Sequence, residues 1–209
     1  MVGYPGQEPA QVTRVEGDIL SKKIKAVCVG CNGGWMSRLE TAIRPLLTPL
    51  ILGEPFLLTP DKYRVIQIWA TMKAIVGEMD DPTRRAIPPN SAVQFYRTRN
   101  LLMASKLWIG SYTGSTWSTN AQYTHGGGTG VPGVYFQTST FCIGHLYLHF
   151  ATTSNPFQGY CLYEPADTML VEIPTSADIA WPRLNGINDA HAEKIANWIY
   201  DPRRVASWV

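Results

Sequence analysis

Two cysteines separated by two residues, Cys28 and Cys31, constrain the first third of the chain more than any other feature. This spacing lets both thiolates reach one metal ion, and Gly30 permits the tight turn that directs them to the same side. A redox-active pair is an alternative, but that motif opens a helix after a buried strand in a βαβ unit, and no such pattern surrounds these residues. Two incidental cysteines are the third interpretation. The sequence favours a metal knuckle from which a helix starts near Trp35.

The composition is that of a folded chain with one sizeable core or two small regions that share an interface. Of the 209 residues, 45% are hydrophobic and only 16% are charged. No apolar run approaches the roughly 18 residues that cross a bilayer, and the longest, residues 46–52, contains Pro49. No basic-then-apolar leader opens the chain, and four cysteines with one close pair do not form the pattern of a secreted disulfide framework. We therefore expect no membrane partner and a reducing compartment.

Hydrophobic periodicity and turn residues predict an α+β fold, in which helices and a zinc-knuckle remnant precede an antiparallel sheet. The clearest element is a helix that begins at Thr59-Pro60-Asp61 and carries apolar residues at helical spacing up to Met79. Further helices are predicted over residues 35–43, 90–99 and 189–200, and Pro45 and Pro49 are expected to break the chain into short segments after the first of them. The predicted strands are 12–15 and 19–27 (a hairpin turning at Gly17-Asp18), 106–112 and 116–123 (a second hairpin), 134–140, 141–152 and 169–173. The chain therefore divides into regions 1–104 and 105–209, which we expect to form one compact unit.

Residues 27–40, with the sequence Val-Cys-Val-Gly-Cys-Asn-Gly-Gly-Trp-Met-Ser-Arg-Leu-Glu, resemble the second half of the ββα-metal module of HNH-type endonucleases. They are especially similar to a group of bacterial and phage proteins that end this module with Cys-x-x-Cys-Asn-x-Gly-Trp-Met-Ser-x-Leu-Glu. The similarity is specific at these residues and weak over the rest of the chain. It implies a structural zinc ion bound by Cys28 and Cys31, and a protein that acts in the cytoplasm of a bacterial host cell.

The chain departs from this family at the residues that perform the chemistry. In the family an earlier cysteine pair completes the zinc site, and a histidine near the first strand is the general base. Here no cysteine precedes Cys28 and no histidine precedes His125. Asn32 matches the family's position after the cysteines, but an amide cannot deprotonate water. The catalytic residues of the family therefore have no counterpart in this sequence.

The later histidines offer few substitutes for the missing base. His125, beside a run of three glycines in a predicted flexible loop, is the one candidate for a displaced base. His145 and His149 are four residues apart in a predicted strand, which places them roughly 13 Å apart and too far to share a metal ion. We expect these two to be polar positions on a sheet face, and Cys142 to be a buried small apolar residue.

Basic residues surround the cysteine pair. Lys22, Lys23 and Lys25 belong to the strand that leads into it, and Arg38 follows on the helix. The first half of the chain carries an excess of Lys and Arg, and the second half an excess of Asp and Glu. Such residues can neutralise phosphates, although a solvated hairpin face is the alternative. We predict that these four residues contact nucleic acid.

Two functions remain open on the sequence. The protein is either a non-catalytic, degenerate HNH-like protein that binds nucleic acid or a host defence complex, such as a phage-encoded CRISPR inhibitor, or an active metal-dependent endonuclease whose base comes from elsewhere or from a partner chain. The count of two ligands predicts that two chains pair and share a Cys₄ zinc site made by Cys28 and Cys31 of each, which gives a two-fold homodimer. An alternative of equal weight is that no zinc is bound and the thiols of Cys28 and Cys31 are free.

Overall fold

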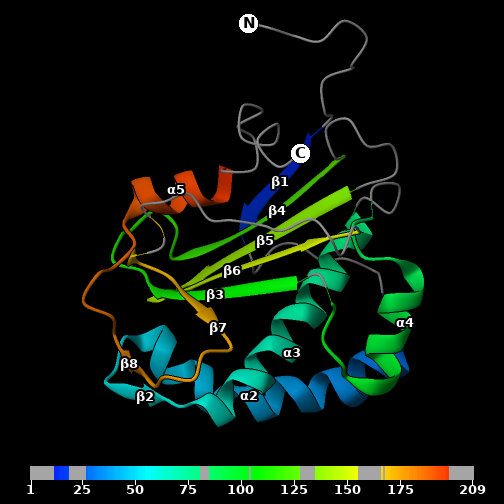
Figure 1. Cartoon of the computed structure of the whole chain (residues 1–209), viewed down its shortest axis with the longest axis horizontal. Helices are drawn as coiled ribbons and strands as arrows, with labels where there is room; N and C mark the ends of the chain where they lie inside the picture. Colours follow the sequence, from blue (N-terminus) through cyan, green and yellow to red (C-terminus); the bar gives the residue numbers. More distant parts are fainter. Residues whose placement is uncertain are drawn as a thin grey trace, which may run out of the picture.

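The computed structural model describes residues 12–18, 27–80, 85–103, 105–127, 135–154, 166 and 168–197, with the backbone alone described at 12–18, 80 and 125–127. It confirms the α+β class. A layer of helices covers one face of an antiparallel sheet, and one further helix lies over the other face (Figure 1).

The main sheet has six strands in the order β1-β4-β5-β6-β3-β7, and every neighbouring pair is antiparallel. Strands β4, β5 and β6 follow one another along the chain and across the sheet. Strand β3, which precedes them, lies beside β6, so these four strands form a Greek key. The strands are β1 (Val12–Asp18), β3 (Ser105–Ser111), β4 (Thr119–Gly127), β5 (Tyr135–Ile143), β6 (Leu146–Thr153) and β7 (Val171–Ile173).

The predicted turn of the first hairpin is wrong. Gly17 and Asp18 lie inside β1, where they pair with Ala121 and Asn120 of β4. A Gly-Asp pair marks a turn only when the segments on either side of it pair with each other, and here the distant strand β4 offers β1 seven consecutive partners. Residues 19–26, the predicted return strand, lie outside the described residues.

The second predicted hairpin is also wrong in its pairing. Strands form near both predicted positions, but β3 pairs with β6 and β7, whereas β4 pairs with β1 and β5. The reason is burial: β3 is buried continuously from Leu107 to Ser111, and a strand buried on both faces needs neighbours on both edges and cover above and below. A local hairpin with β4 would not supply them.

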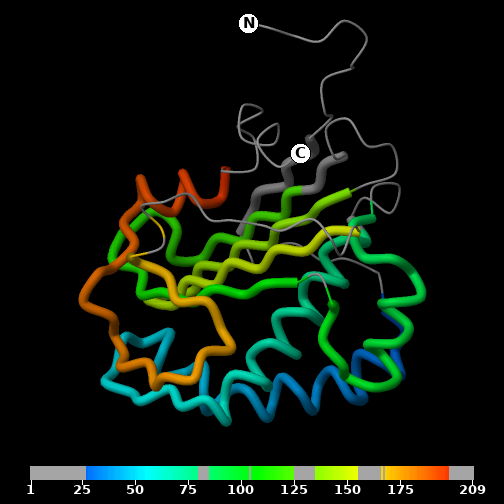
Figure 2. Tube along the Cα trace, in the orientation of Figure 1, coloured from blue at the N-terminus to red at the C-terminus, as the bar shows by residue number. Residues whose placement is uncertain are grey.

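The longest described helices of the helical layer are α2, α3 and α4, and the last two start as the sequence predicts. Thr59 is the N-cap residue of α3 and Pro60 occupies its first turn, and α4 starts after Pro88. In Figure 2, α2 runs along the bottom of the molecule, α3 lies above it, and α4 stands at the N-terminal end of α2. The helices are α2 (Ser37–Leu52), α3 (Pro60–Gly77) and α4 (Pro89–Thr98).

The predicted break after residue 43 is wrong, because α2 runs through both Pro45 and Pro49. Each proline removes one helix hydrogen bond, but Ile43, Leu47 and Leu50 bury one continuous apolar stripe against the core. The helix ends instead at Gly53, whose φ of 70° is the left-handed conformation of a helix C-cap. A small two-stranded sheet follows, made of β2 (Phe56–Leu58) and β8 (Ile179–Trp181).

Helix α3 holds the helical layer against the sheet. The Trp69 ring lies 5.9 Å from that of Phe141, and the side-chain amide of Gln137 donates a hydrogen bond to the Ala74 carbonyl at 2.9 Å. One apolar cluster spans residues of both predicted regions, from α2 and α3 to β3, β5 and β6. The first strand, β1, likewise belongs to the sheet of the second region.

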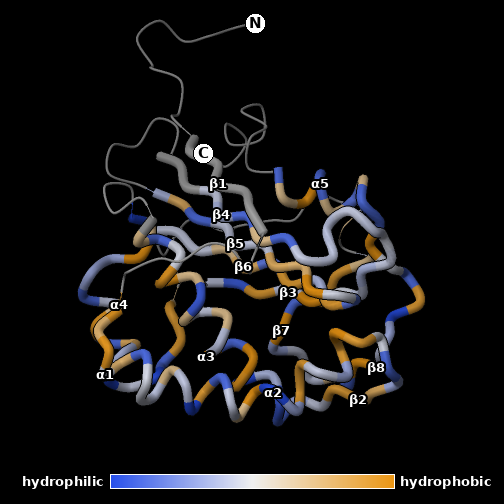
Figure 3. The backbone as a smooth tube through the Cα atoms, turned by 180° about the vertical axis from the view of Figure 1, so that it is seen from behind, coloured by the Kyte–Doolittle hydropathy of each residue, from blue (hydrophilic) through white to orange (hydrophobic). Residues whose placement is uncertain are grey.

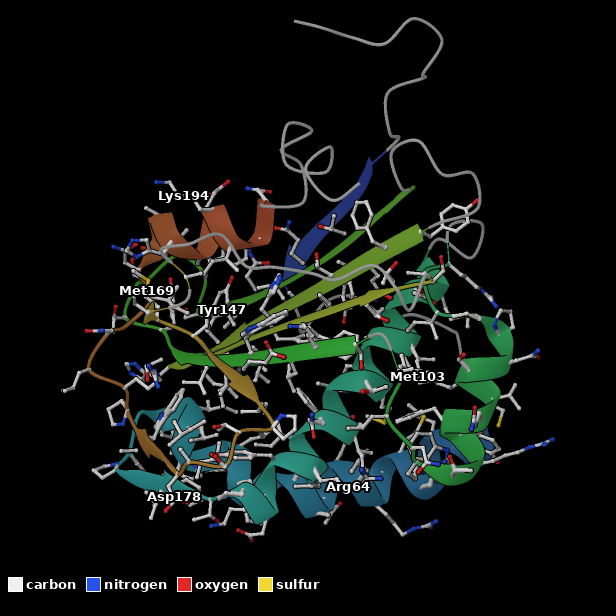
Figure 4. The ribbon with its side chains drawn as sticks, in the orientation of Figure 1. Arg64, Met103, Tyr147, Met169, Asp178 and Lys194 are labelled. Carbon is white, nitrogen blue, oxygen red and sulfur yellow. The ribbon has the colours of Figure 1, made fainter. Side chains whose placement is uncertain are left out.

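The last described helix, α5 (Asp189–Asn197), covers the opposite face of the sheet (Figure 4). The Tyr147 hydroxyl donates to the Ala192 carbonyl at 3.2 Å, and the Gln122 amide donates to the Ala196 carbonyl at 3.1 Å. Asn188 caps the helix by accepting a hydrogen bond from the His191 amide at 3.0 Å. Residues 198–200 of the predicted helix lie outside the described chain.

A buried carboxyl group organises the end of α3. Glu78 is 2% exposed, and its Oε1 accepts hydrogen bonds from the amides of Ala86 at 2.6 Å and Ile87 at 2.8 Å. Burial raises the pKa of Glu78 to about 7, against the effect of these two amides and of nearby Arg85. The carboxyl group therefore ties the end of α3 to the backbone that precedes α4. Above neutral pH it carries a charge that is poorly solvated.

We expect the stability of the protein to fall between about pH 5 and pH 8 because of Glu78. The pKa of Glu78 is raised in the folded state, so as the pH rises the unfolded chain releases the Glu78 proton at a lower pH than the folded chain does. The free energy of unfolding therefore decreases as the pH rises through about 7. Glu78→Gln keeps the acceptor oxygen and removes the charge, so it should be more stable than the wild type at pH 8 by at most about 3 kcal/mol, and similar at pH 5. Urea denaturation at both pH values measures the difference. A variant whose advantage is the same at both values would contradict this role.

The close approach of α3 to the sheet is testable at Gly77. A methyl group there would overlap the ring of Tyr123, so Gly77→Ala should destabilise the protein by about 1–3 kcal/mol. In an open helix the same substitution stabilises by about 1 kcal/mol. Gly33→Ala is the matched control, since no atom lies within 4 Å of its added Cβ. If the denaturation midpoints of Gly77→Ala and Gly33→Ala shift by the same amount, the helix does not touch the sheet at Gly77.

Candidate functional site

Cys28 and Cys31 lie on one turn at the start of a helical run that leads into α2. This run consists of α1 (Val29–Cys31) and the π-helical turn η1 (Asn32–Met36). Cys28 is the N-cap residue: its sulfur accepts a hydrogen bond from the Cys31 amide at 3.3 Å, and its carbonyl accepts one from the Asn32 amide at 3.0 Å. The helical run therefore begins at Val29, inside the pair, and not near Trp35 as the sequence predicts.

The two thiols differ in environment. Cys28 is exposed, whereas Cys31 is half-buried against the main apolar cluster. Hydrogen bonds from the Cys31 side chain and amide lower the pKa of Cys28 below its ordinary value. The interaction with Cys28, and then burial, raise the pKa of Cys31, while the Tyr96 side chain acts in the opposite direction. Of the two, Cys28 is the more accessible and the more readily ionised thiol.

Helix α4 supplies a wall of aromatic rings beside the pair. The Trp35 ring meets Phe95 and Tyr96 edge to face, with centroids 6.2 and 6.1 Å apart. The Arg99 guanidinium lies 3.7 Å from the Trp35 ring centroid. Figure 3 shows α1 and α4 side by side at one end of the helical layer. We call the set Cys28, Cys31, Trp35, Tyr96 and Arg99 the thiol–aromatic corner.

Arg99 is held over Trp35 by the end of α4. It is the C-cap residue, its φ is 58°, and its amide donates to the Phe95 carbonyl at 2.8 Å. Its guanidinium donates to the same carbonyl at 3.1 Å. The left-handed backbone that ends α4 thus turns the side chain back across the aromatic wall. No sequence signal near Cys28 identifies Arg99, because its partner Trp35 is 64 residues away along the chain.

The described residues do not complete a zinc site. Among them, no group of three His, Cys, Asp or Glu side chains could hold a metal ion. A tetrahedral structural zinc needs four ligands, so within the described part of the chain Cys28 and Cys31 stand as a pair. The shared Cys₄ site and the homodimer stay predictions.

Only one of the four predicted phosphate contacts can be located. Arg38 is exposed on the first turn of α2, one helical turn beyond Trp35. Lys22, Lys23 and Lys25 lie outside the described residues. The structure adds exposed Arg97 beside Tyr96, and Arg64 of α3, which donates to the Arg99 carbonyl at 3.4 Å. The one sequence signal that points to Arg97 is the helix predicted over residues 90–99, which contains it.

The histidines lie away from this corner. His125 is part of β4, where it pairs with Thr13 and Gln137, so the predicted loop is wrong at this residue. His149 is fully buried in β6, with its Nδ1 2.8 Å from the Thr140 hydroxyl, and burial lowers its pKa to about 3. His145 lies in the turn before β6, not in a strand, and its Nδ1 is 3.0 Å from the Tyr112 carbonyl. Cys142 is fully buried, as predicted.

A cavity of about 430 Å³ lies between α4, the segment that follows it and the end of β6. Met103, labelled in Figure 4, marks the segment that borders it. Its lining contains no charged side chain. The lining residues are Pro88, Ser91, Gln94, Phe95, Asn100, Leu101, Leu102, Met103, Thr152, Thr153 and Ser154.

Comparison of the chain with protein-family models, with curated protein sequences and with solved structures found no match. Within the described ranges, no helix combines the length and the apolar character needed to cross a membrane.

The stacking of Arg99 on Trp35 predicts a measurable stability difference. Arg99→Lys keeps the positive charge but loses the planar group that stacks, so it should lower the free energy of unfolding by about 0.5–1 kcal/mol. Arg99→Ala loses both the stacking and the charge. Arg99→Gly loses them too, but it should be about 1 kcal/mol more stable than Arg99→Ala, because glycine adopts the left-handed backbone without strain. Guanidinium denaturation of the three variants separates the two effects. A lysine variant as stable as the wild type would show that the stacking contributes nothing.

Proposed function

We propose that the protein is a non-catalytic relative of HNH-type nucleases that binds nucleic acid through the thiol–aromatic corner and the arginines beside it. The observation that carries the proposal is the combination, on one end of the helical layer, of exposed guanidinium groups with a partly exposed aromatic ring. Arg38 and Arg97 are exposed, and Tyr96 is 48% exposed.

The chemistry of these groups suits a single strand with accessible bases. Arginine side chains contact phosphates, and an exposed tyrosine ring offers a face on which a base can stack. No ion pair is found between these arginines and an acidic side chain in the described part of the chain, whereas Lys73 pairs with Glu40 at 2.5 Å and Lys106 with Glu172 at 3.1 Å. Among the described residues, the charges of Arg38 and Arg97 are therefore not shared with a carboxylate as those of Lys73 and Lys106 are.

The resemblance of residues 27–40 to the ββα-metal module supports the same class of partner. The missing histidine of that module argues against hydrolysis, because the remaining Asn32 cannot act as a base. Fully buried His149 cannot reach a substrate. A binding function uses the part of the module that the chain retains.

Binding should depend on Tyr96, Arg38 and Arg97. We expect Tyr96→Ala to weaken binding of a single-stranded oligonucleotide by about 1–3 kcal/mol and Tyr96→Phe to leave it nearly unchanged, since phenylalanine keeps the ring. Arg38→Ala and Arg97→Ala should each reduce the slope of log K against log salt by about 0.7. Fluorescence anisotropy with labelled single-stranded and duplex DNA and RNA at several salt concentrations measures both effects.

Lys194→Ala is the matched control, because Lys194 is exposed on α5, over the opposite face of the sheet (Figure 4). It should change neither the affinity nor the salt slope. The same samples are incubated with magnesium or manganese, and sustained cleavage that is lost in His125→Ala would establish the nuclease in place of the binder. If the wild type neither binds nor cleaves, the proposal fails, and a protein complex becomes the partner to seek.

A further inference from the structure

We propose that Cys28 and Cys31 are a redox-active dithiol that closes to an intramolecular disulfide by exchange with a low-molecular-weight disulfide. This goes beyond nucleic-acid binding and does not depend on it. It rests on the position of the two cysteines on one turn and on their unequal exposure.

The turn places the two thiols within reach of each other. The Cys31 amide is 3.3 Å from the Cys28 sulfur, and the hydrogen bond from the Asn32 amide to the Cys28 carbonyl, at 3.0 Å, closes the turn behind the pair. Because Cys28 and Cys31 share this one turn, we expect a disulfide between them to form by rotation of their side chains.

The surroundings decide which thiol reacts first. Cys28 is exposed, its neighbour Val29 is 90% exposed, and no atom lies within 4 Å of a Cβ built at Gly30 or Gly33. A small disulfide can therefore approach the Cys28 sulfur from solvent. Cys31 is half-buried against the apolar cluster and beside Tyr96 and Trp35. It is placed to resolve an adduct on Cys28 and is poorly placed to meet the disulfide itself.

The exchange proceeds in two balanced steps. The Cys28 thiolate attacks one sulfur of the disulfide RSSR, which forms a Cys28–S–S–R bond and releases RS⁻, and this takes up a proton to give RSH. The Cys31 thiolate then attacks the Cys28 sulfur, which forms the Cys28–Cys31 bond and expels the second RS⁻ as RSH. Two electrons and two protons pass from the protein to RSSR, which leaves as two RSH.

Glutathione disulfide is the probe that tests the proposal. The full chain is first analysed for zinc, then incubated with glutathione disulfide in the presence of a chelator, and finally denatured and alkylated for intact-mass measurement. The wild type should lose two of its four thiols and carry no glutathione. Cys31→Ser should accumulate one glutathione on Cys28, several-fold more than Cys28→Ser accumulates on Cys31. The Cys28→Ser, Cys31→Ser double variant reports the background of the other two cysteines.

Three results would overturn the proposal. These are a wild type that stays fully reduced, equal adducts in the two single variants, or zinc that resists the chelator and protects the pair from oxidation. Circular dichroism of each variant shows that its fold is intact. Thiol counts and nucleic-acid affinity are independent measurements, so failure of one proposal is distinguishable from failure of the other.

Discussion

The contact between α3 and the sheet determines where everything else in the described chain can lie. At Gly77 the helix backbone comes so close to Tyr123 that no side chain larger than hydrogen fits between them. Nearer the start of the same helix, the Trp69 ring packs against Phe141, with the ring centroids 5.9 Å apart. Because protein interiors are close-packed, a helix held at this distance leaves defined positions for its neighbours. Helix α2 lies against α3, and Glu78 at the end of α3 holds the backbone of Ala86 and Ile87, which precede α4. The aromatic wall beside Cys28 is therefore a consequence of how α3 meets the sheet.

The helices were predictable from the sequence, whereas the pairing of the strands was not. Capping residues and apolar periodicity act over a few residues, so the starts of α3 and α4 can be read at Thr59-Pro60 and Pro88-Pro89. Strand pairing depends on partners far along the chain: β1 pairs with β4 more than one hundred residues later, and β3 with β6 instead of with its neighbour in sequence. The prolines of α2 show the same limit in a helix, since burial of Ile43, Leu47 and Leu50 outweighs a local signal to stop.

The part of the candidate site formed by residues close in sequence could be predicted, whereas the part that depends on tertiary contacts could not. The Cys28–Cys31 pair, Trp35 and Arg38 form a local motif whose spacing indicates a turn followed by a helix. Tyr96 and Arg99 reach that motif only because α4 folds against the start of α2, and the stacking of Arg99 depends on a left-handed C-cap residue that is not glycine. The sequence around Arg99 does not indicate a left-handed backbone, because glycine is the usual residue at such a helix end. The partners of a local motif thus emerge only with the tertiary fold.

The corner around Cys28 is held together by several contacts within the protein. The turn is closed by backbone hydrogen bonds, Met36 is buried in the main cluster, and Arg99 covers the Trp35 ring. Helix α4 adds aromatic and cation–π contacts with Trp35, which are worth about 0.5–2 kcal/mol each. A pair of thiols on a turn that is already stable can change its oxidation state while the fold around it stays intact, which is the physical condition for a reversible dithiol.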